Sequence, residues 1–375
     1  MIKRLFLLKP IIAALLLTAN CITYAAVPDS IRKNLEDFDY LTNFTEENHA
    51  VFPAIMEQGY KKTYESLKKK LRKQVTKGET GIEKAATEYV FWFYKNFDTH
   101  SWIETPLWDC LEKTVSIDYS TLMEYQPQPV SCKVDEQTWL VRVPSCVGNH
   151  PTNEWVLQAS KDYWESGCDY LIIDVRGNEG GNDAIWAPFK NMLADHKRER
   201  PFESYFRNTA YNQKFWEFII EQVDNKPFYQ EFLNNCKETA GKGEYKLWAV
   251  NDCSDITPMS HPKRAAVMID QGTASAGEAL IQLYVRGVSN RTKVYGKEGT
   301  YGADLTGNVF QTKLPNAGYL VTYPTCMEYK EFLEYHVFGE NGFQPDVTIE
   351  IPYPKRLTDN IDEWVLWVAD DLKKQ

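Results

Sequence analysis

The chain has 375 residues and a formal net charge of −10 at pH 7, with 52 acidic against 42 basic residues. Because an excess of negative charge repels a phosphate backbone, we expect no general binding of nucleic acid. The length exceeds one ordinary domain, and we expect a helical region followed by a large α/β part.

The first 25 residues have the features of a secretory signal peptide. Basic residues follow Met1, an apolar stretch covers residues 11–17, and small residues lie around Ala25. This stretch is too short to span a bilayer, so residues 1–25 are predicted to be removed during export to the periplasm or the cell exterior. Lipid attachment to Cys21 is disfavoured because Asn20 replaces the small residue that usually precedes a lipidated cysteine.

Residues 26–100 are predicted to form an all-helical region. Tyr60, Tyr64, Leu67 and Leu71 recur at helical spacing and would share one face of a helix. Glycines at positions 78 and 81 then break the pattern before a second amphipathic stretch begins.

Residues 101–375 alternate strands and helices in the manner of a βαβ core. The predicted strands cover residues 136–143, 170–175, 265–270, 293–295, 318–323 and 347–351, and the predicted helices cover residues 156–164, 275–285 and 359–372. Because the stretch over 170–175 is almost continuously apolar, we expect this strand to be buried on both faces of a parallel sheet.

An aromatic-rich stretch at about 197–262 interrupts this core. We predict that it is a mostly helical insertion with a small core of its own. A lid over the substrate is the alternative.

Seven of the eight cysteines follow the predicted signal peptide. Local spacing favours two bridges, Cys132 with Cys146 and Cys236 with Cys253, and buried free thiols are the alternative. None of the cysteines has the spacing of a zinc site, so we expect neither a metal nor another cofactor.

A serine lies where a predicted buried strand gives way to a helix, in the segment from Gly272 to Glu278. The start of a helix offers unpaired backbone N–H groups and a positive dipole end, which together stabilise an oxyanion. Ser275 at such a turn is therefore a candidate nucleophile, and a simple helix N-cap is the alternative. The strand over 170–175 ends in a second glycine-rich turn, from Arg176 to Asn182.

Together these two turns resemble the paired motifs of the C-terminal-processing (tail-specific) protease and tricorn-core superfamily of serine peptidases. The resemblance covers roughly residues 98–351 apart from the insertion. It implies an α/β fold with a tail-specific-protease-like ββα-type core sheet, flanking helices and the helical insertion. It also implies Ser275 as the nucleophile and an oxyanion hole built from the N–H of Ala276 and of Gly180 or Gly181, with the choice of glycine left open.

Members of this superfamily with a Ser–Lys dyad carry the lysine where this chain has Ala303. The sequence is instead similar to the tricorn-like branch, which implies His100 as the general base and Glu340 as the carboxylate that orients it. Only a short stretch separates His100 from the strand over 136–143. This leaves no room for the PDZ domain that many members carry.

The sequence thus predicts an exported serine endopeptidase, not membrane-spanning, that acts on peptides or unfolded proteins. A catalytically silent protein that binds peptides or hydrophobic ligands on the same fold is the alternative. Exopeptidase action and the oligomeric state remain open on these residues.

Overall fold

The computed structural model describes residues 28–108, 127–148, 151–223, 225–239, 242–328, 330, 342–355 and 361–374. The predicted signal peptide lies outside these residues. None of the described helices is long and apolar enough to cross a membrane.

The N-terminal part is helical, as predicted. Its helices are α2 (Asp29–Asn48), α3 (Phe52–Ile55), the π-helical turn η1 (Met56–Tyr60), α4 (Lys61–Thr76) and α5 (Ile82–Asn96). Buried aromatic and aliphatic side chains at helical spacing, such as Phe38, Leu41, Tyr89 and Phe93, join them into one core. The loop after α5 carries Asp98 and His100.

A six-stranded sheet forms the centre of the α/β part, in the order β11-β8-β7-β4-β3-β2. Its strands are β2 (Val130–Lys133), β3 (Thr138–Arg142), β4 (Tyr170–Asp174), β7 (Arg264–Met268), β8 (Thr292–Gly296) and β11 (Val347–Thr348). All neighbours pair in parallel except β2 with β3. The predicted strands at residues 136–143, 170–175 and 265–270 are therefore confirmed as the adjacent strands β3, β4 and β7.

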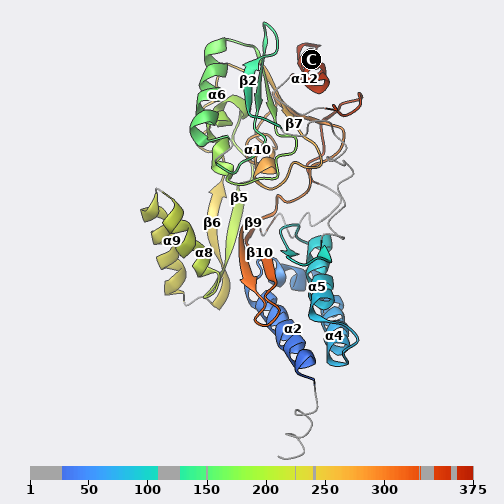
Figure 1. The fold of residues 1–375 in the computed structure, drawn as a ribbon. Coiled ribbons are helices and arrows are strands. Elements are labelled where there is room, and N and C mark those ends of the chain that lie inside the picture. The colour runs from blue at the N-terminus through green and yellow to red at the C-terminus, as the bar shows by residue number, and fades with distance from the viewer. Residues whose placement is uncertain are drawn as a thin grey trace, which may run out of the picture.

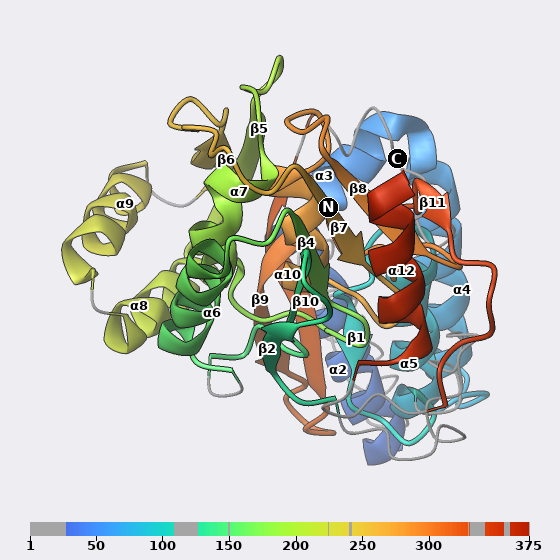
Figure 2. The same ribbon diagram turned by 90° about the horizontal axis from the view of Figure 1, so that it is seen from above.

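Alternate side chains of this sheet point to opposite faces, where they belong to two separate hydrophobic cores. Leu171 and Ile173 pack with α6 (Asn153–Ser166) and α10 (Ala276–Tyr284), whereas Ile172 packs with α12 (Glu363–Lys374) on the other face. Short helical segments η4 (Asp183–Phe189) and α7 (Lys190–Leu193) complete the α6 side. Figure 2 shows α6 and α12 on opposite sides of the central strands. Burial on both faces explains the continuous apolar run over residues 170–175.

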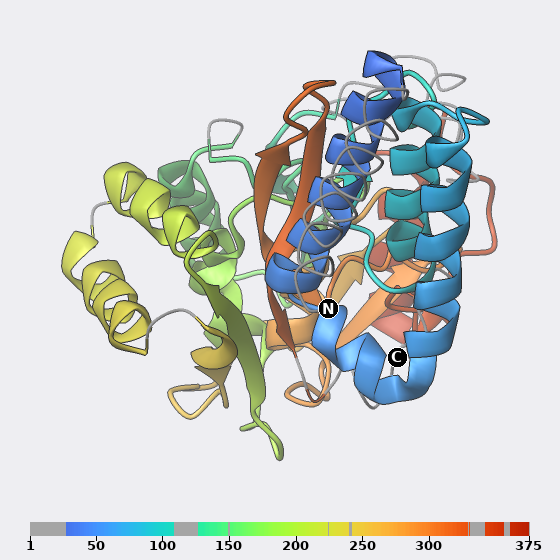
Figure 3. The same ribbon diagram turned by 90° about the horizontal axis from the view of Figure 1, so that it is seen from below.

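A second, antiparallel sheet lies below the first (Figure 1). It contains β1 (Trp102–Ile103), β5 (Phe202–Thr209), β6 (Lys242–Asn251), β9 (Thr306–Lys313) and β10 (Leu320–Glu328). Figure 3 shows this sheet between α2, α4 and α5 on one side and the helices α8 (Gln213–Gln222) and α9 (Lys226–Glu238) on the other.

The insertion at about 197–262 differs from the prediction. The helices α8 and α9 are present, but two long strands, β5 and β6, flank them and join β10 in the antiparallel sheet. Aromatic residues favour strands as much as buried helix faces, so the aromatic content alone could not separate the two. Phe206, Trp216, Leu233 and Cys236 belong to a small core, which the insertion shares with Cys326 of β10.

The two predicted disulfide bridges are wrong. All four cysteines are free thiols. Cys132 packs with the α12 face of the parallel sheet and Cys146 with the α6 face, so the sheet separates them. Cys236 and Cys253 likewise belong to different cores.

We therefore expect non-reducing peptide mass spectrometry of the folded protein to find Cys132 and Cys146 as thiols. Burial raises the pKa of Cys146 to about 12, whereas Cys132 is partly exposed, so iodoacetamide should modify Cys132 first in the folded protein. In denaturant the two rates should become similar. A peptide that links the two cysteines would contradict the fold described here.

Candidate active site

The site begins with two turns at the carboxyl edge of the parallel sheet, one after β4 and one after β7. Asn178 ties them together: its backbone oxygen accepts from Ala274 N at 2.8 Å, and its side-chain Oδ1 accepts from Gly180 N at 2.9 Å. Asp270 Oδ1 accepts from Gly177 N at 2.9 Å. The two glycine-rich segments of the sequence therefore form one structure.

Buried charges fix the turn after β4. Arg176 donates to both carboxylate oxygens of Asp174, at 2.9 and 2.7 Å, and Arg142 donates to the same group at 2.6 Å. Although burial opposes ionisation, these two guanidinium groups hold the pKa of Asp174 well below its usual range. Asp362 adds a second carboxylate to the cluster. These ion pairs therefore fix the conformation of the turn after β4.

Ser275 has a strained backbone at the start of α10. Its φ of 50° and ψ of −118° are unusual for a residue with a side chain, and its N–H donates to Glu278 Oε2 at 2.9 Å. The turn after β4 passes very close to it, since a Cβ at Gly180 would lie 2.8 Å from the Ser275 Cβ. Only glycine fits there.

Glu278 holds the loop between β8 and β9. Its carboxylate is fully buried and accepts from the Thr300 hydroxyl and from the N–H groups of Gly302 and Ala303, both at 2.7 Å. Burial and the nearby Asp304 carboxylate nevertheless raise the pKa of Glu278 to about 8, and burial raises that of Asp304 to about 6. Ala303 thus contributes its backbone N–H, which donates to Glu278.

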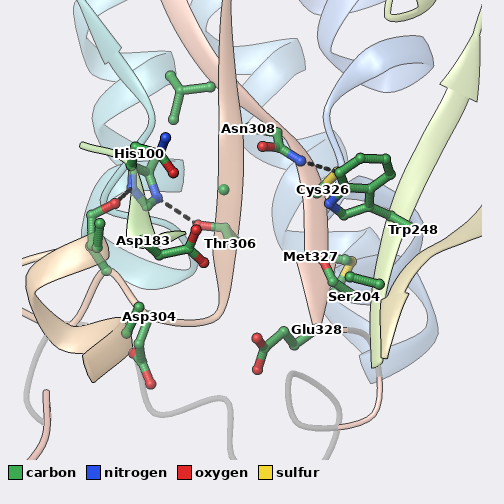
Figure 4. A pocket seen from close by; sticks show the side chains of 18 of the residues that line it. His100, Asp183, Ser204, Trp248, Asp304, Thr306, Asn308, Cys326, Met327 and Glu328 are labelled. Carbon is green, nitrogen blue, oxygen red and sulfur yellow. Dashed lines mark hydrogen bonds between the residues drawn. The ribbon is translucent and has the colours of Figure 1, made fainter. Parts of the chain in front are cut away.

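His100 reaches Ser275 from the loop after α5. Its Nε2 lies 3.1 Å from Ser275 Oγ, and its Nδ1 lies 2.8 Å from the hydroxyl of Thr306 at the start of β9 (Figure 4). Thr306 in turn donates to Asp98 Oδ1 at 2.6 Å. The structure therefore brings together the predicted pair, Ser275 and His100.

This network assigns the protons on His100. The Thr306 hydroxyl has one proton, which goes to Asp98, so it accepts from the Nδ1–H of His100. The Nε2 atom is then unprotonated and faces the Ser275 hydroxyl. This is the tautomer that a general base requires.

Asp98 is the buried carboxylate of the network, and the sequence analysis did not single it out. It accepts from the Ser101 hydroxyl at 2.6 Å, which lies 2.7 Å from His49 Nε2. Burial alone would raise its pKa, but His100, His49 and Ser101 lower it to about 2. Asp98 is therefore ionised at neutral pH. In the sequence, the signal for Asp98 was its position two residues before the predicted base His100. The residue that links the two side chains, Thr306, lies 208 residues after Asp98.

The candidate oxyanion donors differ in their bonding. The N–H of Gly180 is occupied by Asn178, whereas among the described residues no acceptor bonds the N–H of Gly181 or of Ala276. Both lie, with Ser275 and His100, in the lining of a cleft of about 690 Å³. Glu340 falls outside the described residues.

Comparisons with known proteins agree with this fold. A family model described as peptidase family S41 matches residues 138–349, more than half of the chain. No curated protein matches.

Among solved structures, a protein of Parabacteroides merdae ATCC 43184 assigned as a peptidase has a TM-score of 0.53 at 15% identity, over 92% of this chain and 97% of its own. A lipoprotein from Streptococcus agalactiae has a TM-score of 0.46 at 15% identity over the same shares. The tricorn protease has a TM-score of 0.32 at 15% identity, over 63% of this chain and 18% of its own.

The buried His49 predicts an acid-sensitive fold. Burial lowers the pKa of His49 to about 4, against its usual value of about 6.5, so on acidification the unfolded chain binds a proton that the folded chain does not. Between pH 7 and pH 4 this one group should cost about 3 kcal/mol of stability.

The measurement is urea denaturation at both pH values for the wild type and for His49→Gln. The variant should lose less stability on acidification, whatever its stability at pH 7. Parallel losses in the two proteins would show that His49 is not the responsible group.

Proposed function

The chain belongs to peptidase family S41, and from that premise we propose that it is an exported serine endopeptidase with Ser275 as nucleophile and His100 as general base. The observation that carries the proposal is the 3.1 Å contact between His100 Nε2 and Ser275 Oγ, in the tautomer described above. The predicted signal peptide supports export.

The reaction follows from these positions. Ser275 Oγ attacks the carbonyl carbon of the scissile bond while its proton passes to His100 Nε2. The tetrahedral intermediate collapses, and His100 gives that proton to the leaving amine, which leaves an acyl group on Ser275. Water then attacks the ester, again losing a proton to His100, and release of the acid restores the Ser275 hydroxyl.

The N–H groups of Gly181 and Ala276 are the proposed oxyanion hole. Both line the cleft beside Ser275, and neither has an acceptor among the described residues. The N-terminus of α10 adds a positive dipole end at the same place. Gly180 instead has no side chain, and this allows the two turns to approach each other closely.

Asp98 is proposed to orient His100 and to stabilise its charged form through Thr306. The imidazole Nδ1 of His100 lies 3.6 Å from Asp98 Oδ1, so the Thr306 hydroxyl between them is the stronger link. Glu340 remains a prediction for the same role. The resemblance on which it rests is independent of the Asp98 contacts.

The silent binding protein remains the second candidate, and a covalent probe separates it from the peptidase. We expect a fluorophosphonate to label Ser275 in the folded protein, because the base and the oxyanion donors activate that hydroxyl. Intact-mass measurement should show one adduct, located at Ser275 by peptide mapping. The Ser275→Ala variant and the urea-denatured protein are the controls and should not react. Folded wild-type protein without an adduct would favour the binding protein.

Thr306 offers a test of the orienting group. Thr306→Val keeps the shape but removes the hydroxyl, and we expect kcat to fall by about 10²-fold with little change in KM, whereas Thr306→Ser should retain most of the activity. Both variants are compared with Glu340→Gln on one fluorogenic peptide across pH 5–9.

If Thr306 only filled space, valine would preserve kcat and the smaller serine would not restore it. Wild-type kcat in Thr306→Val, together with a large loss in Glu340→Gln, would assign the orienting role to Glu340 instead.

A further inference from the structure

The cleft around Ser275 and His100 has a one-sided charge. Its lining includes the carboxylates of Glu179, Asp183, Asp304 and Glu328, and the described residues that form it include no lysine or arginine. Lysine and arginine make up 42 of the 375 residues of the chain. A lining without either therefore departs from the composition of the whole protein.

Two of these carboxylates lack a lysine or arginine partner, although the imidazole of His100 acts on Asp304. Among the described residues, no lysine or arginine forms an ion pair with Asp183 or Asp304. The side chain of Asp183 is exposed to solvent, yet the walls of the cleft crowd it enough to raise its pKa. Carboxylates in such surroundings are stabilised when a cation comes close.

The same two residues flank the reacting atoms. Asp183 lies two positions after Gly181, and Asp304 lies two positions before Thr306, whose hydroxyl bonds His100. In Figure 4, Asp183 and Asp304 lie on the side of the pocket that carries His100, and Trp248 lies on the opposite side. A peptide whose scissile carbonyl meets Ser275 therefore places its neighbouring side chains within reach of these carboxylates.

The opposite wall of the cleft is aromatic. It comes from the insertion and includes Phe215, Trp216, Tyr229 and Trp248. Trp216 is only 1% exposed, and its ring N–H has no acceptor among the described residues. The ring lies within the core of the insertion, so it contributes apolar bulk to this wall while its N–H stays out of contact with solvent.

We propose that Asp183 and Asp304 make the cleft selective for peptides with a Lys or Arg side chain next to the scissile bond. This inference rests on the proposed peptidase function. The attraction acts inside a cleft with apolar walls, where charges interact more strongly than in open water. A glutamate at the same place in the substrate meets repulsion, so the selection works in both directions.

The test uses a peptide found by mass spectrometry in a mixed library and then remade with Lys, Met or Glu at each residue flanking the cleaved bond. We expect kcat/KM for the Lys peptide to exceed that for the Met peptide by about tenfold, and that for the Glu peptide by more. The preference should shrink as salt is raised from low to high concentration.

Asp183→Asn should reduce the Lys-over-Met ratio of kcat/KM by about threefold or more. Glu165→Gln, which removes an exposed carboxylate on α6 outside the cleft, is the matched control and should leave the ratio as in the wild type. Equal ratios in the wild type and Asp183→Asn would overturn the role of Asp183.

Binding to Ser275→Ala separates this inference from the proposed function. Fluorescence anisotropy of the three peptides measures selectivity without turnover. Fluorophosphonate labelling of Ser275 together with equal handling of the Lys, Met and Glu peptides would overturn the selectivity and leave the peptidase standing. Preferential binding of the Lys peptide by a protein that never reacts with the probe would keep the selectivity and refute the peptidase.

Discussion

The close approach of the Gly180 backbone to Ser275 is the constraint on which the site depends. A side chain at position 180 would collide with Ser275, and one at position 277 would lie 2.6 Å from the Asn178 oxygen. Two turns that interlock this tightly must leave adjacent parallel strands at the same edge of one sheet, as β4 and β7 do. The small residues of both motifs follow from that geometry.

Two buried carboxyl groups near the active site, Asp98 and Glu278, have very different pKa values because their surroundings differ. Asp98 lies among two histidines and two hydroxyl groups, which keep it ionised with a pKa of about 2. Glu278 is just as buried, but its nearest charged neighbour is Asp304, and its pKa rises to about 8. The first arrangement suits a partner for a cationic imidazole. The N–H groups that donate to Glu278 lower its pKa, but they do not offset burial and the Asp304 charge.

Much of this arrangement could be predicted from the sequence where local patterns determine it. The continuous apolar run over 170–175 indicates a strand buried on both faces, and the Gly272–Glu278 segment indicates the turn into α10. The link between Asp98 and Thr306 could not be predicted, because it depends on where β9 starts in a sheet assembled from distant segments. For the same reason, sequence spacing misled the pairing of Cys132 with Cys146, since proximity along the chain does not show on which face of a sheet a residue lies.

His100, Thr306 and Ser275 belong to three differently built parts: the loop after the N-terminal helices, the antiparallel sheet and the edge of the parallel sheet. No single part holds both a nucleophile and a base. Under the proposed chemistry, a chain that is not yet fully folded, or one cut between β1 and β7 whose fragments have dissociated, is harmless to its neighbours. Completion of the fold would then prevent premature proteolysis, a task that a separate inhibitory segment performs in other peptidases.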